Sequence, residues 1–100
     1  RTQTLSLGGR DIVVEQEWDG VPGHTGSALW QSGKALAAFM EQLGPDYWTG
    51  LNVLELGCGT GLASITAHYL GSSNVLATDG NEDVVKLARR NIALNRVDRK

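Results

Sequence analysis

Three closely spaced glycines follow an acidic residue near the middle of the chain. Gly57, Gly59 and Gly61 come directly after an apolar stretch typical of a buried strand, and a helical pattern begins at Leu62. Glycine lets the backbone turn sharply and lets a ligand approach the main chain. The start of a helix presents unpaired N–H groups and a partial positive charge. This strand, loop and helix therefore predict a site for a nucleotide-like ligand.

The spacing of the glycines and the residue before them indicate which nucleotide is bound. A dinucleotide fingerprint has the spacing G-x-G-x-x-G, which would place its third glycine at Leu62, whereas this loop reads G-x-G-x-G. Glu55 lies two residues before Gly57. Its carboxylate would repel a pyrophosphate and attract an ammonium or sulfonium group. The loop therefore favours S-adenosylmethionine over NAD, with the backbone of Cys58 contributing to the site.

A second acidic residue follows the next predicted strand. Asp79 lies about 20 residues after the glycine loop, where an acidic side chain accepts hydrogen bonds from ribose hydroxyls. Gly80 and Asn81 follow it directly, and we assign all three residues to the cofactor site. The alternative is that Asp79 adds a stabilising charge near the start of the next helix.

The surrounding pattern predicts an α/β chain with a leading β-hairpin. The hairpin comprises Thr4–Leu7, a Gly-Gly turn and Asp11–Gln16. We expect Gly44-Pro45 to stop the first helix and Asn81 to cap the last one. The remaining predicted elements alternate between helix and strand: helix 28–43, strand 51–56, helix 62–70, strand 74–78 and helix 82–95.

Composition sets limits on the class of protein. The chain has 100 residues, 41% of them hydrophobic and 20% charged, which is typical of one globular domain. No apolar run approaches the roughly 20 residues that span a bilayer, so we expect no membrane helix. One cysteine, Cys58, allows no internal disulfide and no multi-cysteine zinc site, and we predict no metal. A reducing compartment fits, so we expect a cytoplasmic protein, with the nucleus as a second candidate location.

Charge is unevenly distributed along the chain. The net charge of −2 argues against a general nucleic-acid binder, which usually presents a basic face. Glu15, Glu17 and Asp19 make the front of the chain acidic. Basic residues gather near the end of the chain: Lys86, Arg89, Arg90, Arg96, Arg99 and Lys100. We interpret the basic stretch as a solvated helix face, and the alternative is a contact surface for substrate or RNA.

Four segments together resemble a known family. They are Thr25-Gly26-Ser27-Ala28-Leu29-Trp30, Glu55-Leu56-Gly57-Cys58-Gly59-Thr60-Gly61-Leu62, Thr78-Asp79-Gly80-Asn81 and Arg90-Asn91-Ile92-Ala93-Leu94-Asn95. The chain resembles the family 16 methyltransferases, a branch of the seven-β-strand enzymes rich in protein lysine methyltransferases. The glycine motif is shared by many methyltransferases, and the segment that ends at Trp30 narrows the resemblance to this family.

The resemblance implies a Rossmann-like methyltransferase fold, of which this chain is the N-terminal half of a doubly wound sheet. It places Trp30 beside the cofactor, where an indole face suits a sulfonium, with core packing as the alternative. We divide the chain into residues 1–26, a hairpin and loop, and residues 27–100, the first half of the cofactor-binding domain. The family's Asp/Glu-x-x-Tyr/Phe acceptor motif and the remaining strands do not occur within residues 1–100.

The predicted function is methyl transfer from S-adenosylmethionine to lysine side chains of a protein substrate. The alternatives are methylation of a small molecule or another nitrogen acceptor, and a non-catalytic cofactor-binding module. No catalytic base is identified in these residues. Cys58 is not expected to act as a nucleophile, because no histidine lies at a suitable spacing and its contribution comes from the backbone. The oligomeric state is not predicted.

Overall fold

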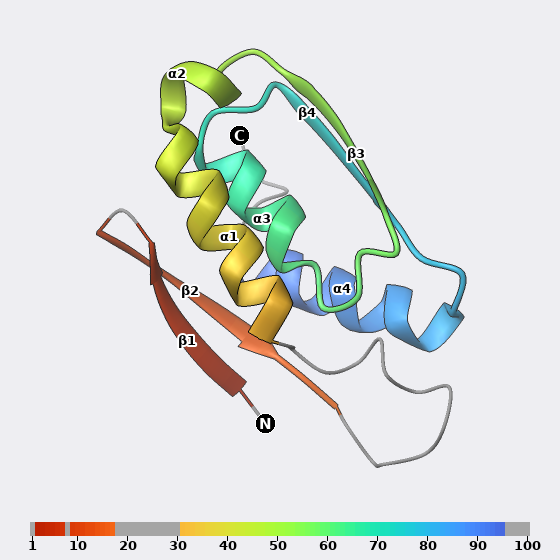
Figure 1. Ribbon diagram of the computed structural model, residues 1–100. Helices are drawn as coiled ribbons and strands as arrows, with labels where there is room; N and C mark the ends of the chain where they lie inside the picture. The colour runs from red at the N-terminus through yellow and green to blue at the C-terminus, as the bar shows by residue number, and fades with distance from the viewer. Residues whose placement is uncertain (1, 8, 18–30, 96–100) are drawn as a thin grey trace.

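A computed structural model describes residues 2–7, 9–17 and 31–95. The described part is a mixed α/β chain in which a hairpin is followed by helices alternating with two parallel strands (Figure 1). None of the described helices is long and apolar enough to cross a membrane. The elements in chain order are β1 (Thr2–Leu7), β2 (Arg10–Glu15), α1 (Gln31–Leu43), α2 (Pro45–Trp48), β3 (Asn52–Leu56), α3 (Leu62–Tyr69), β4 (Asn74–Thr78) and α4 (Glu82–Leu94).

The hairpin pairs β1 with β2 in an antiparallel register in which Leu5 lies opposite Ile12. It confirms the predicted hairpin, with strands that begin at Thr2 and Arg10 rather than at Thr4 and Asp11. Side chains alternate across the two faces of a strand. Ile12 and Val14 are therefore buried together on one face.

The parallel pair β3–β4 lies on the opposite side of the helices from the hairpin, so that α1, α3 and α4 form a middle layer (Figure 1). Val53 pairs with Val75 and Leu56 with Thr78. The predicted strands 51–56 and 74–78 are confirmed within one residue. Parallel strands end at the same edge of a sheet, and this brings the glycine loop after β3 next to Asp79 after β4.

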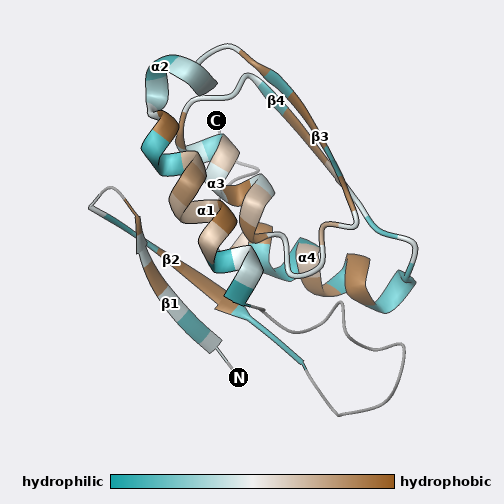
Figure 2. Ribbon diagram, in the orientation of Figure 1, coloured by the Kyte–Doolittle hydropathy of each residue, from teal (hydrophilic) through white to brown (hydrophobic). Residues whose placement is uncertain are grey.

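The main apolar core lies between the hairpin and the helices. Ile12 and Val14 of β2 pack with residues of α1 and α3, and Ile65 of α3 is completely buried. Figure 2 shows the corresponding apolar stretches along β2, α1 and α3. Arg10 also lies over the ring of Tyr69, 4.4 Å from its centroid. The hairpin therefore contributes directly to the core that supports the helices.

Two helix ends follow the sequence prediction and one short helix does not. Asn81 caps α4, its side-chain oxygen accepting from the backbone N–H groups of Asp83 (2.9 Å) and Val84 (3.2 Å). Gly44 ends α1 with φ of 81°, as expected. Pro45, however, also begins α2, which the sequence analysis did not predict. Proline suits the first position of a helix, because its missing N–H would have no partner there.

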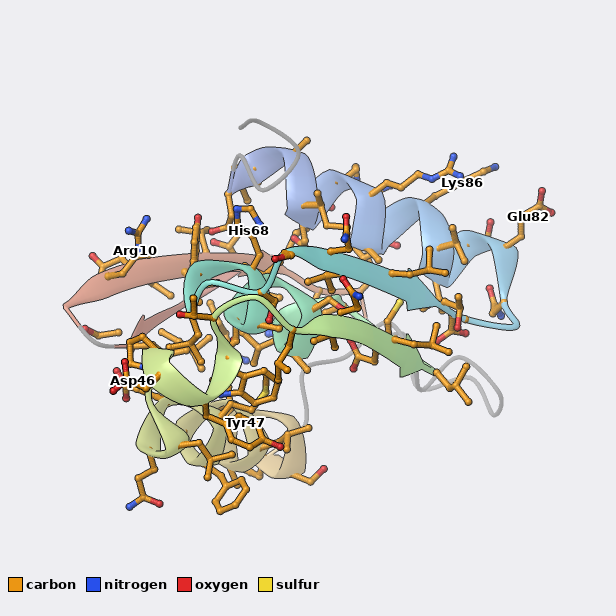
Figure 3. All side chains as sticks on the ribbon, turned by 90° about the horizontal axis from the view of Figure 1, so that it is seen from above. Arg10, Asp46, Tyr47, His68, Glu82 and Lys86 are labelled. Carbon is orange, nitrogen blue, oxygen red and sulfur yellow. The ribbon has the colours of Figure 1, made fainter. Side chains whose placement is uncertain are left out.

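The outer face of α4 is polar, and Figure 3 shows Glu82 and Lys86 pointing away from the parallel strands. Arg90 lies nearer the hairpin and pairs with Glu15 and Glu17 at 3.2 Å and 3.1 Å. Arg90, one residue of the basic stretch, therefore neutralises negative charge of Glu15 and Glu17 near the start of the chain. Arg96, Arg99 and Lys100 lie outside the described residues.

One face of the parallel pair is uncovered in the part of the chain that the structure describes. Val53 and Val75 are half-buried on the side of α3, whereas the alternate residues Leu54, Leu56 and Leu76 are 61%, 78% and 62% exposed. Parallel sheets are normally covered on both faces.

Candidate functional site

The glycine loop joins β3 to α3 through three left-handed backbone positions. Gly57, Gly59 and Gly61 have φ of 68°, 55° and 94°, which L side chains adopt only with strain. The Cys58 N–H donates to the carbonyl of Thr78 at 2.7 Å, and the Gly61 N–H donates to the carbonyl of Cys58 at 2.9 Å. These bonds close the loop against the end of β4.

Asp79 joins the loop to the start of α4. One carboxylate oxygen accepts from the Gly59 N–H at 3.1 Å, and the other accepts from the Asn81 N–H at 3.1 Å. A carboxylate oxygen can accept more than one hydrogen bond, so these contacts leave capacity for ribose hydroxyls. Asp79 therefore organises the loop itself, a role that the sequence analysis did not predict.

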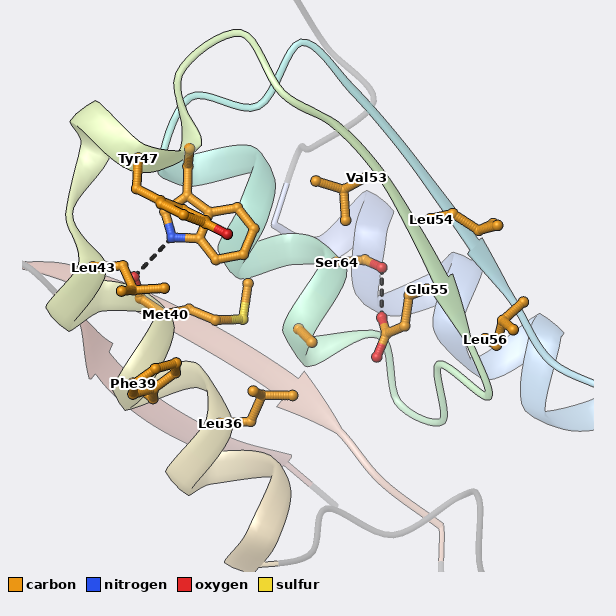
Figure 4. A pocket seen from close by; sticks show the side chains of 12 residues that line it. Leu36, Phe39, Met40, Leu43, Tyr47, Val53, Leu54, Glu55, Leu56 and Ser64 are labelled. Atoms are coloured by element: carbon orange, nitrogen blue, oxygen red, sulfur yellow. Dashed lines mark hydrogen bonds between the residues drawn. The ribbon is translucent and has the colours of Figure 1, made fainter.

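Glu55 is held by a neighbour on α3. The Ser64 hydroxyl donates to its Oε1 at 2.6 Å, as drawn in Figure 4. Desolvation by burial raises the pKa of Glu55 above its usual value, while the hydrogen bond from Ser64 opposes that rise and the charge of Asp79 adds to it. Ser64 therefore both orients the carboxylate and favours its ionised form.

A cleft of about 320 Å³ lies between the glycine loop and the first turns of α1. Glu55 and the loop residues Gly57 to Thr60 form one wall, and Ser32, Gly33 and Leu36 form the other. Cleft volumes of roughly this size suit small organic ligands. The arrangement combines main-chain groups of the glycine loop with a carboxylate that can face a cation.

The Cys58 residue lines this cleft, and the pKa of its thiol is raised there. Burial and, to a lesser extent, the neighbouring carboxylates of Glu55 and Asp79 together raise its pKa to about 11. Burial disfavours charge of either sign, whereas the two carboxylates disfavour an anion such as a pyrophosphate and attract a cation.

A second, more apolar pocket of about 470 Å³ adjoins the cleft and shares Glu55 with it. Figure 4 shows Leu36 and Met40 of α1 directed toward β3 across this pocket, which Phe39 also lines. The Trp48 indole N–H donates to the Met40 carbonyl at 2.9 Å, which fixes α2 against the end of α1.

The profile of a lysine methyltransferase family matches residues 9–100 of the chain. The chain belongs to this lysine methyltransferase family. Similar proteins include the ribosomal protein L11 methyltransferase of Acetivibrio thermocellus, 36% identical over 89 residues that make up 88% of this chain and 26% of the relative. Methyltransferase-like protein 22 of Mus musculus is 35% identical over 85% of this chain and 25% of its own length. Protein-lysine N-methyltransferase EFM3 of Chaetomium thermophilum is 40% identical over 73% of this chain.

The chain thus spans about a quarter of the length of these methyltransferases. Membership of the lysine methyltransferase family confirms the resemblance found in the sequence. Residues 2–7, 9–17 and 31–95 contain no group of three or more His, Cys, Asp or Glu side chains that could hold a metal.

The structure brings most of the predicted site residues of this chain together. Glu55, Gly57, Cys58 and Gly59 line the cleft, whereas Asp79 is not part of its lining and contacts the loop through the Gly59 N–H. Gly61 begins α3, while Gly80 and Asn81 form the turn into α4. Trp30 lies outside the described residues, so its assignment stays a prediction.

Sequence reasoning missed two polar side chains that hold the glycine loop in place. Ser64 contacts Glu55, and Asn91 of α4 donates to the Thr60 carbonyl at 2.8 Å. Both lie on helix faces that the apolar pattern marks as inward, where a polar residue needs a partner. That signal was available in the sequence, although it does not identify the partner.

Proposed function

We propose that this chain holds the S-adenosylmethionine site of a protein lysine N-methyltransferase. The observation that carries the proposal is a cleft that Glu55 and the glycine loop line together, in a chain that belongs to the lysine methyltransferase family. The names of similar proteins, a ribosomal protein L11 methyltransferase and a protein-lysine N-methyltransferase, support a protein as the acceptor. In this proposal the parallel pair is part of a doubly wound Rossmann-like sheet.

The residues present fit this cofactor. When bound, S-adenosylmethionine supplies a methyl group on a positively charged sulfur. Glu55 offers a carboxylate to the cationic end of the ligand, and Asp79 has acceptor capacity for the ribose hydroxyls. The loop backbone around Gly57 and Gly59 permits close approach of the ligand.

The chain's main contribution to the reaction is alignment. Holding two reactants in the correct geometry can remove several kcal/mol from a barrier. A lysine acceptor has a reference pKa near 10.4 and must lose its proton before it reacts, which an apolar environment favours. The apolar walls around Leu36, Phe39 and Met40 begin next to Glu55 and lower the polarity on that side of the site.

The test uses the whole protein with radiolabelled S-adenosylmethionine and a lysate as the source of acceptors. We expect label on protein, and we expect peptide mass spectrometry to find it as methyl-lysine. Binding of the cofactor is measured separately by isothermal titration. Label on another side chain or on a small molecule would reject the lysine proposal, and the absence of cofactor binding would reject the site itself.

A further inference from the structure

Asn91 of α4 and Asn95, the residue that caps the C-terminal end of α4, face the outer edge of the hairpin. Asn91 and Asn95 are one helical turn apart, so their side chains lie on the same side of the helix. The Asn95 amide accepts from the Val13 N–H at 3.0 Å and donates to the Val13 carbonyl at 2.7 Å. The Asn91 amide makes the same pair of bonds with Glu15, at 2.7 Å and 2.9 Å. Together the two amides provide hydrogen-bond partners for the backbone N–H and carbonyl groups of Val13 and Glu15, on the edge of β2 that does not pair with β1.

Only Asn91 also reaches the glycine loop. Its Nδ2 donates a further bond to the Thr60 carbonyl at 2.8 Å, whereas the corresponding bond of Asn95 goes to the Asn91 carbonyl within α4. Asn91 is completely buried and Thr60 is 4% exposed. One side chain therefore links α4, β2 and the glycine loop.

This bond fixes one peptide plane of the loop from both sides. The Thr60 carbonyl and the Gly61 N–H belong to the same planar peptide unit and point in opposite directions. Asn91 holds the carbonyl, and the Cys58 carbonyl accepts from the Gly61 N–H. Two residues before Gly61, the Gly59 N–H donates to the Asp79 carboxylate. Two residues that follow β4 therefore restrain a loop whose glycines would otherwise be free to adopt other conformations.

We propose that Asn91 is a positioning residue of the cofactor site, which fixes the glycine loop and couples its shape to the docking of the hairpin. The proposal rests on the cofactor assignment above. Asn91 does not line the cleft, and neither does the hairpin. Their effect on the ligand comes from holding the loop in its binding conformation before the ligand arrives, because a preordered loop loses less entropy on binding.

The test compares Asn91→Asp with Asn95→Asp in the whole protein. Each variant keeps an oxygen for the strand N–H and removes two donor bonds, one to β2 and one elsewhere. The two variants are therefore matched in their damage to hairpin docking and differ in the loop bond. Thermal melts measure the loss of stability, and isothermal titration with S-adenosylmethionine, well below both melting temperatures, measures the dissociation constant.

We expect both variants to lower the melting temperature to a similar extent, while Asn91→Asp raises the dissociation constant at least tenfold and Asn95→Asp changes it less than twofold. Equal affinities in the two variants would overturn the positioning role. If Asn91→Asp does not fold, Asn91→Ser and Asn95→Ser replace the pair, because a serine avoids a buried carboxylate and still loses the loop bond. A wild-type protein that binds no cofactor would instead reject the proposed function.

Discussion

The Ser64 hydroxyl donates a 2.6 Å hydrogen bond to the Glu55 carboxylate at the point where the cleft meets the apolar pocket. The two residues belong to α3 and β3 and lie nine positions apart. Burial raises the pKa of Glu55, and the bond from Ser64 opposes that rise and so favours the ionised carboxylate. The pair gives the site a carboxylate that is both oriented and sensitive to pH.

Replacing Ser64 with Ala should shift the pH dependence of cofactor binding. The pKa of Glu55 is already raised by burial, and Ser64 opposes that rise, so its removal raises the pKa further. Affinity for a cationic ligand depends on the carboxylate and falls as pH drops through this pKa. We expect the fall to begin at higher pH in Ser64→Ala than in the wild type, measured by titration calorimetry between pH 5 and 8.

A matched control for this prediction is Ser72→Ala. Ser72 is also buried, but its hydroxyl bonds to the Trp48 carbonyl, away from Glu55. Its pH profile should follow that of the wild type. Superimposable profiles for Ser64→Ala and the wild type would show that Glu55 does not need this partner. Glu55→Gln should remove the pH dependence due to this group.

Replacing Asp79 with Ala should weaken cofactor binding by about 1–3 kcal/mol, the usual contribution of hydrogen bonds to a charged acceptor. The variant removes the predicted ribose acceptor and also releases the Gly59 N–H. Isothermal titration measures the change. Asp83→Ala is the control, because Asp83 carries the same charge in the first turn of α4. An unchanged affinity in Asp79→Ala would remove this residue from the site.

Much of the site could be predicted because its signals are local. The glycine loop, the strand before it and the Asn81 cap each depend on residues within a few positions. The short helix α2 was missed because Pro45 was interpreted only as a helix stop. The spacing of Asn91 and Asn95 shows that they share a helix face but not what that face meets. Their partners Glu15 and Val13 lie 76 and 82 positions away, a distance that no local pattern covers.

Cys58 should react slowly with thiol reagents in the folded protein. The thiolate is the reactive form, and a pKa of about 11 leaves roughly one hundredth of the thiolate of an ordinary cysteine with a pKa of 9.0 at pH 8. Glu55→Gln should speed alkylation, because it removes a negative charge that helps to raise the pKa of the Cys58 thiol. The rate is followed with iodoacetamide and mass spectrometry.

The control for the cysteine prediction is Glu82→Gln, a change of the same charge at the start of α4. It should leave the alkylation rate unchanged, and unfolding in urea should raise the rate in every variant. Fast alkylation of the folded wild type would mean that the thiol is neither buried nor surrounded by negative charge.

Residues 1–100 expressed alone should associate rather than form a stable, active monomer. Leu54, Leu56 and Leu76 share one exposed face of the parallel pair, and each strand of this pair has one neighbour among the described residues. Uncovered apolar faces and open strand edges both favour pairing with other chains. Sedimentation should therefore find dimers or larger species, with a broad thermal melt and no methyl transfer to protein in a lysate.

Charged substitutions can show whether this face is the cause of the association. Leu76→Lys should increase the monomer fraction, because a lysine on a sheet face opposes its burial against another chain. Leu94→Lys is the matched control, since Leu94 is 52% exposed on α4, away from the parallel pair. An equal gain of monomer in both variants would indicate a general effect of charge. If wild-type residues 1–100 form a monomer that melts sharply and transfers methyl groups, two predictions are contradicted. One is that this segment associates, and the other is that it is inactive while this face is uncovered.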